Sequence, residues 1–196
     1  MPLLSPLVLI ISTALANNIV LTNFLGVTEV TNIDETIQEK SATPTDYIKY
    51  AKSLSLIVLI TLVISLPMVF FIYTNLLARF DLLFLQNILF IMVTAIIGNV
   101  ITKYYEMKKS AGVKAIAVTL NSVVLGIFLI DPMTTIVTAL IYAFGTALGF
   151  GLVLYIVTTI RIRLQVAKVI KSFEGYPILL VTLAIAAMAF RGFLGM

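Results

Sequence analysis

The sequence predicts an all-α integral membrane protein with six transmembrane helices. Of its 196 residues, 61% are hydrophobic, and the mean hydropathy is +1.13, far from the balance of a soluble domain. The 13 basic and nine acidic residues are clustered along the chain. They leave charge-free runs at residues 1–28, 53–78, 82–102, 115–130, 132–160 and 175–190.

The lengths of these runs fit helices that cross a membrane. A hydrocarbon core of roughly 30 Å needs about 20 helical residues. The shorter runs, 115–130 and 175–190, reach this length with their flanks, because Lys114 can snorkel and Arg191 sits near its helix end. Barrel strands alternate apolar and polar residues, and these runs do not. We therefore expect a single membrane domain over residues 1–196.

The first run also resembles a secretory signal peptide, because Ala14-Leu15-Ala16 follows an apolar stretch. No Lys or Arg precedes this stretch, so the positively charged region of a signal peptide is missing. We expect the run to be retained as the first span.

The missing residue types limit the chemistry of the chain. It contains no cysteine, histidine or tryptophan, which excludes disulfides, thiolate or imidazole metal ligands and histidine acid-base chemistry. The net charge of +4 comes from basic residues in short loops between spans. We interpret it as a topology signal and expect no nucleic-acid partner.

The basic residues predict how the chain is oriented. With six spans, the loops at 28–52, 103–114 and 161–174 share one side of the membrane and hold 11 of the 13 basic residues. The positive-inside rule makes this side cytoplasmic, so both termini face outward in a multi-pass protein of the cytoplasmic (inner) cell membrane. Arg161 and Arg163 are the expected anchor at the cytoplasmic end of the fifth span.

Asparagines in two spans indicate an internal repeat. Asn17, Asn18 and Asn23 lie in the first run, and Asn121 with Ser122 in the fourth. A repeat of three spans must insert upside down relative to its copy. The pattern therefore predicts two inverted three-helix repeats, at about residues 1–103 and 111–196. The four asparagines would then form a polar centre near the midplane of the membrane.

Two interpretations of these amides stay open. They can bond neighbouring helices and merely hold the bundle together, or they can line a functional centre. From the residues alone, the chain could be a small secondary transporter whose repeats rock around this centre, or a structural helix bundle.

Two other segments allow narrower predictions. Gly145 and Gly149 have the G-x-x-x-G spacing that lets two helix backbones approach closely. The segment 28–47 is polar, and Pro44 should break any long helix there. We interpret this segment as a solvated cytoplasmic linker, or alternatively as a docking surface for a soluble partner.

Several strings of the chain resemble the RnfA/NqrE family of membrane subunits. They are Ala16-Asn17-Asn18-Ile19-Val20-Leu21, Asn23-Phe24-Leu25-Gly26-Val27, Asn121-Ser122-Val123-Val124-Leu125-Gly126, and in the C-terminal third Gly149-Phe150, Ile160-Arg161, Arg163-Leu164, Val166-Ala167, Ala189-Phe190 and Gly192-Phe193. The resemblance implies a six-helix subunit that is not catalytic alone. Its partners would be a homologous sister subunit of opposite orientation and the other subunits of a redox complex. Such complexes pump sodium ions or protons as electrons pass between ferredoxin or a quinone and a nicotinamide cofactor.

The resemblance also implies a two-iron, two-sulfur cluster, held in mid-membrane by cysteines of the two sister subunits. Here the matching positions are Thr28 and Ser122. Hydroxyls are poor ligands for iron–sulfur clusters, which thiolates or occasionally imidazoles hold. We therefore expect that this chain alone binds no cofactor and no metal.

Overall fold

The computed structural model describes residues 6–24, 27, 43–80, 83–109, 135–167, 170–173 and 175–192, and every regular element in these ranges is helical. The all-α class is thereby confirmed. The elements are α1 (Pro6–Ile11), η1 (Ser12–Ala16), α2 (Ile19–Asn23), α5 (Pro44–Ile72), η2 (Tyr73–Leu77), η3 (Leu83–Leu85), α6 (Gln86–Lys109), α9 (Ile136–Val166), η4 (Lys171–Phe173) and α10 (Tyr176–Arg191).

Three stretches are long and apolar enough to cross a membrane, by length and composition: Pro6–Asn23, Pro44–Leu77 and Ile136–Val166. Two shorter apolar helices cover Ile88–Tyr104 and Tyr176–Arg191. Five of the six charge-free runs thus fall on apolar helices, as expected of a membrane protein. The fourth run, 115–130, lies outside the described residues.

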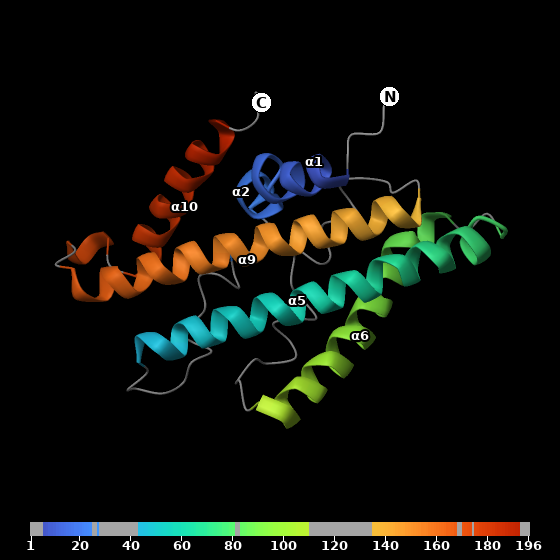
Figure 1. Cartoon of the computed structure of the whole chain (residues 1–196), viewed down its shortest axis with the longest axis horizontal. Helices are drawn as coiled ribbons and strands as arrows, with labels where there is room; N and C mark the ends of the chain where they lie inside the picture. The colour runs from blue at the N-terminus through green and yellow to red at the C-terminus, as the bar shows by residue number, and fades with distance from the viewer. Residues whose placement is uncertain are drawn as a thin grey trace.

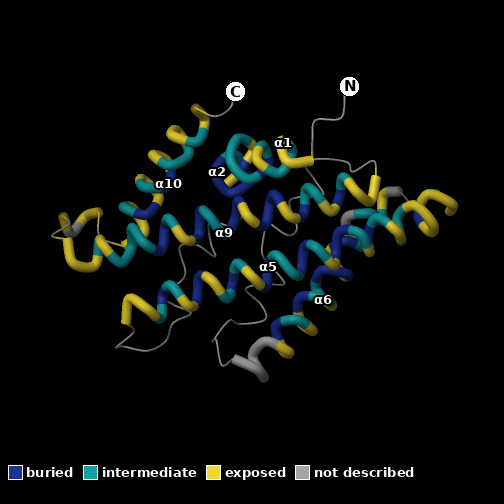
Figure 2. Tube along the Cα trace, in the orientation of Figure 1, coloured by how far each residue is buried: buried dark blue, intermediate teal, exposed yellow. Residues whose placement is uncertain are grey.

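The core of the structure is a pair of antiparallel helices, α5 and α9, which lie side by side in Figure 1. Their shared end is marked by a 3.3 Å hydrogen bond from the Gln165 side-chain amide to the Tyr47 hydroxyl. Figure 2 shows buried residues recurring along both helices. The largest fully buried side chains include Leu54, Ile57, Leu62 and Leu66 of α5 and Phe150 and Leu154 of α9.

The other helices surround this pair. In Figure 1, α6 leaves the far end of α5 and slants away from it, while α1 and α2 lie on the opposite side of α9. Phe90, Val93 and Thr94 of α6 are buried. The C-terminal helix α10 contacts α2, η1 and α9, and only Leu179 and Leu183 of its residues are buried.

The start of α5 corrects the sequence interpretation of Pro44. Pro44 is the first residue of the helix, not a breaker within a linker that continues to Tyr47. Proline suits this position because its missing N–H would have no helical partner there and its φ is already helical. The Asp46 carboxylate also accepts a 3.0 Å hydrogen bond from the Thr43 backbone N–H and one from the Thr43 hydroxyl. The helix therefore begins well before the charge-free run at residue 53.

Candidate functional site

The first of the three stretches that are long enough to cross a membrane, Pro6–Asn23, is here called the first span, and it is interrupted between η1 and α2. Asn17 has φ −102° and ψ 40°, and Asn18 is extended with φ −63° and ψ 112°. Asn17 donates its backbone N–H to the Ser12 carbonyl at 2.7 Å, which ends the first helical piece. The second piece, α2, has five residues and stops where Phe24 adopts the left-handed conformation with φ 55°. Asparagine favours such breaks because its side chain competes for backbone hydrogen bonds.

Asn18 closes this interruption through three side-chain hydrogen bonds. Its Nδ2 donates to the Ala14 carbonyl at 2.8 Å and to the Gly149 carbonyl of α9 at 3.0 Å. Its Oδ1 accepts from the Val20 backbone N–H at 3.1 Å, so the same side chain caps α2. Asn18 is only 1% exposed. Both of its amide donors are therefore satisfied by backbone carbonyls within the protein.

Gly149 and Gly145 form the surface of α9 on which the first span lies. A Cβ at Gly149 would lie 2.8 Å from the Asn18 Nδ2 and 2.9 Å from the Ala14 carbonyl oxygen. A Cβ at Gly145 would overlap the Thr13 hydroxyl and lie 3.2 Å from the Ile10 carbonyl oxygen. A side chain at either position would have to displace the first span. The absence of side chains lets the two backbones approach closely.

The other predicted members of the polar centre differ from Asn18. Asn17 and Asn23 are exposed, and the Asn17 amide makes one long contact of 3.4 Å with the Ser12 hydroxyl. Asn121, Ser122 and Thr28 lie outside the described residues. Within the described part of the chain, Asn18 is therefore the asparagine that joins the first span to another helix.

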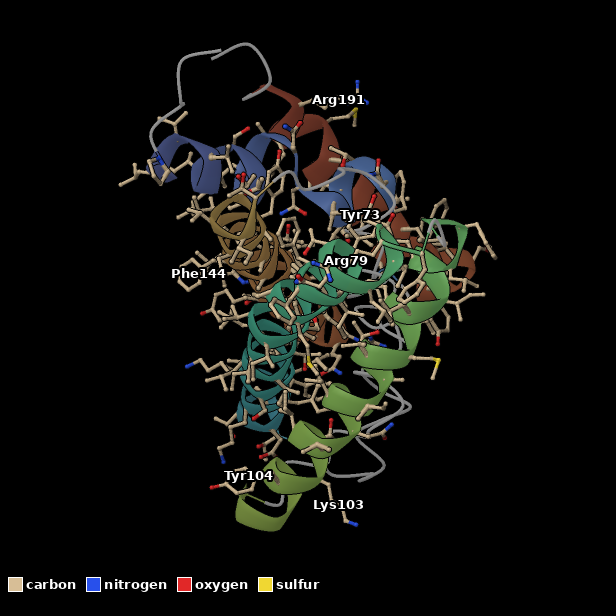
Figure 3. All side chains as sticks on the ribbon, turned by 90° about the vertical axis from the view of Figure 1, so that its right-hand side faces the viewer. Tyr73, Arg79, Lys103, Tyr104, Phe144 and Arg191 are labelled. Carbon is tan, nitrogen blue, oxygen red and sulfur yellow. The ribbon has the colours of Figure 1, made fainter. Side chains whose placement is uncertain are left out.

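Basic residues mark the ends of several helices. Arg161 is partly buried and Arg163 exposed near the C-terminal end of α9, close in sequence to the Gln165 contact with α5. Figure 3, viewed from the end where α5 gives way to η2, shows Lys103 at the lower end of α6, with its side chain directed away from the other helices.

One buried hydroxyl has no counterpart among the sequence predictions. Ser65 on α5 is fully buried, and its Oγ has no hydrogen-bond partner. By contrast, the buried hydroxyls of Thr61, Thr94 and Thr158 each donate to the carbonyl four residues earlier. Ser65 lies two residues before Pro67, in an apolar run where no sequence pattern distinguishes a single serine.

The donor groups of this chain do not fit the iron–sulfur cluster that the family resemblance implies. Such a cluster needs thiolates or imidazoles, and the sequence contains neither cysteine nor histidine. Thr28 and Ser122 would offer hydroxyl oxygens in their place.

Comparison with known proteins places the chain in a family. Residues 7–196 match the family described as "Rnf-Nqr subunit, membrane protein". A protein of Pasteurella multocida, named as one subunit of the ion-translocating oxidoreductase complex, is 34% identical over 197 residues, covering 97% of each chain. Proteins of the same name from Glaesserella parasuis and Shewanella amazonensis are 30% and 31% identical, over 97% of this chain and 96% and 97% of their own lengths. The chain is therefore a member of the Rnf-Nqr family of membrane subunits.

Proposed function

We propose that this chain is a membrane subunit of an Rnf/Nqr-like, redox-driven ion-translocating oxidoreductase complex. It forms part of the transmembrane path for electrons and ions and is not catalytic alone. The observation that carries this proposal is the family match over residues 7–196, together with near full-length relatives named as subunits of such a complex.

The proposed topology is six spans arranged as inverted repeats, at about 1–103 and 111–196, with both termini outward in the cytoplasmic membrane. The antiparallel pairing of α5 and α9 supports it. This pairing brings Lys49 and Lys52 to the same end of the pair as Arg161 and Arg163. Basic residues gathered at one end agree with the positive-inside rule and favour these arginines as the cytoplasmic anchor.

The proposed path passes near the polar residues of the first span, Asn17, Asn18 and Asn23, and near Asn121 of the second repeat. The interruption at Asn17 and Asn18 supports this location, because ion sites in membrane proteins are commonly built at discontinuous helices. The proposed partners are a homologous sister subunit of opposite orientation and the redox-active subunits of the complex.

We further propose that this chain contributes no ligand to an iron–sulfur cluster. The support is the donor chemistry: Thr28 and Ser122 replace the cysteines that the resemblance implies, and no other thiolate is available.

Purification in mild detergent tests the assignment. We expect the chain to co-purify with flavin- or iron-bearing subunits, in membranes that couple electron transfer to ion uptake. The interrupted span is also typical of secondary transporters. If the chain instead purifies as an isolated homo-oligomer that takes up a solute, the assignment to a redox complex is wrong and the chain is a transporter.

Iron analysis and electron paramagnetic resonance test the cofactor proposal on the intact complex. A double variant, Thr28→Cys with Ser122→Cys, is the comparison. We expect no cluster signal that depends on the unmodified chain, and a new signal only where the cysteines are restored. A cluster signal that is lost on deleting the unmodified chain, while all the other subunits remain assembled, would contradict the proposal.

A further inference from the structure

We infer that Asn18 is a positioning residue. It fixes the short helix α2 against α9 and so sets the position of the interrupted first span beside the proposed path. This inference rests on the proposed function. It assigns Asn18 a role that differs from that of its neighbour Asn17, although the sequence predicts that both line the same polar centre.

The hydrogen bonds of Asn18 leave little of its side chain for a passing ion or a partner group. Both N–H groups donate to carbonyls, and Oδ1 accepts from Val20. An amide has at most four hydrogen-bonding capacities, and three are used. The residue is also buried, whereas Asn17 is exposed.

The Gly149 bond crosses the structure and is not a local cap. It joins residues 131 positions apart in sequence and ends on a backbone carbonyl within the long helix α9. Because the acceptor is backbone, its position is set by the whole of α9. The missing side chain at Gly149 lets the amide reach it, since a Cβ there would lie 2.8 Å from the Asn18 Nδ2.

Helix α2 depends on such contacts for its orientation. It has five residues, and an isolated helix of this length is not stable by itself. Its first three residues, Ile19, Val20 and Leu21, are buried, and it contacts α9 and α10. In lipid, a break that left backbone groups unsatisfied would be strongly unfavourable. Asn18 therefore both seals the break and ties α2 to α9.

The substitution Asn18→Ser keeps the N-cap of α2 and removes the bond that ties α2 to α9. Serine can still accept a hydrogen bond from the Val20 N–H as an N-cap residue, but it lacks the amide donors that reach Ala14 and Gly149. Asn17→Ala is the matched control for hydrogen exchange, because it removes an adjacent, exposed amide. Gly149→Ala should weaken the same contact from the α9 side, and Gly192→Ala, where a Cβ meets nothing within 4 Å, is its control.

Two measurements on the intact complex test the inference. The first is hydrogen exchange of the Val20, Leu21 and Thr22 amides, which bond to Asn18. The second is ion uptake per electron transferred, normalised to assembled complex. For Asn18→Ser we expect the exchange of these amides to rise at least about tenfold, because losing the buried bond to Gly149 lets α2 open more often. We expect ion uptake per electron to fall several-fold. Asn17→Ala should stay within about twofold of the unmodified complex in hydrogen exchange, because an exposed amide with one long contact contributes little to stability. The control for ion uptake per electron is Gly192→Ala, which should stay within about twofold, because the added Cβ meets nothing within 4 Å.

The outcomes separate this inference from the proposed function. Unchanged exchange in Asn18→Ser, or an equal rise of exchange in Asn17→Ala, overturns the tether between α2 and α9. Raised exchange with unchanged ion uptake per electron overturns the positioning role, because a merely structural residue would lower only the yield of complex. If the unmodified complex moves no ions, the proposed function fails and the positioning role with it, while hydrogen exchange still measures the tether.

Discussion

The first span and the α5–α9 pair satisfy their backbone hydrogen-bonding groups in lipid in two different ways. Helices α5 and α9 are continuous over 29 and 31 residues, so their interior backbone groups bond within each helix, apart from the one bond that Pro67 of α5 cannot donate. The first span divides 18 residues into two short helical pieces, α1 continued by η1 and, after the break, α2. It is held by the Asn18 side chain and by close contact with Gly145 and Gly149. An interruption in lipid thus needs a neighbouring helix that supplies acceptors and leaves space.

The largest effect is expected where the continuous helices pack. Leu62→Ala removes a fully buried side chain of α5 and should lower the free energy of unfolding by about 2–4 kcal/mol, through lost contacts and a cavity. Unfolding in mixed detergent micelles would measure it. Leu180→Ala on α10, where the side chain is half exposed, is the control and should change the free energy by less than about 0.5 kcal/mol. Equal losses would mean that α5 is not the packing centre.

The glycine contacts allow a sharper comparison of the two regions. A Cβ at Gly149 meets the Ala14 backbone, which cannot rotate away, whereas a Cβ at Gly151 meets only the Ser55 side chain on α5. Gly149→Ala should therefore destabilise the protein by about 1–3 kcal/mol, and Gly151→Ala by less. The same unfolding measurement ranks them. The reverse order would show that α9 is packed more tightly against α5 than against the first span.

The buried hydroxyl of Ser65 predicts a change of opposite sign. Ser65→Ala removes an oxygen that has no hydrogen-bond partner, so the free energy of unfolding should rise by up to about 1 kcal/mol. Thr61→Val, one turn earlier on α5, removes a hydroxyl that donates to the Ile57 carbonyl and should not stabilise. A loss of stability in Ser65→Ala would indicate that this oxygen has a partner in the membrane.

The smallest effect is expected at the shared end of the pair. Tyr47→Phe removes the hydroxyl that accepts a 3.3 Å hydrogen bond from Gln165 and should cost about 0.5 kcal/mol. Gln165→Leu should cost a similar amount, and the double variant no more than either alone, because both remove one bond. Additive losses would mean that the two side chains act separately.

Hydropathy predicted the helical class and the approximate place of five apolar helices, three of them in stretches long enough to cross a membrane, because charge clustering is a property of the local sequence. It did not predict that the first span is interrupted, since Asn17 and Asn18 are averaged with apolar neighbours. Nor could it identify Gly149 as the partner of Asn18, because the two are 131 residues apart. The prediction for Pro44 was wrong because proline breaks a helix in its interior but also begins one, and the adjacent Thr43 and Asp46 are typical of a helix beginning.

The lengths of α5 and α9 bear on how the complex meets the water around it. The spanning stretches have 34 and 31 residues, or roughly 51 and 46 Å at about 1.5 Å each. Even a lean of about 40° leaves the shorter one near 35 Å in height, above the roughly 30 Å of hydrocarbon. The end of the pair that carries Lys49 and Arg163 then extends beyond the hydrocarbon into the headgroup layer. In the orientation proposed above, this basic end would be the part of the chain that a soluble electron carrier meets at the cytoplasmic surface of the membrane.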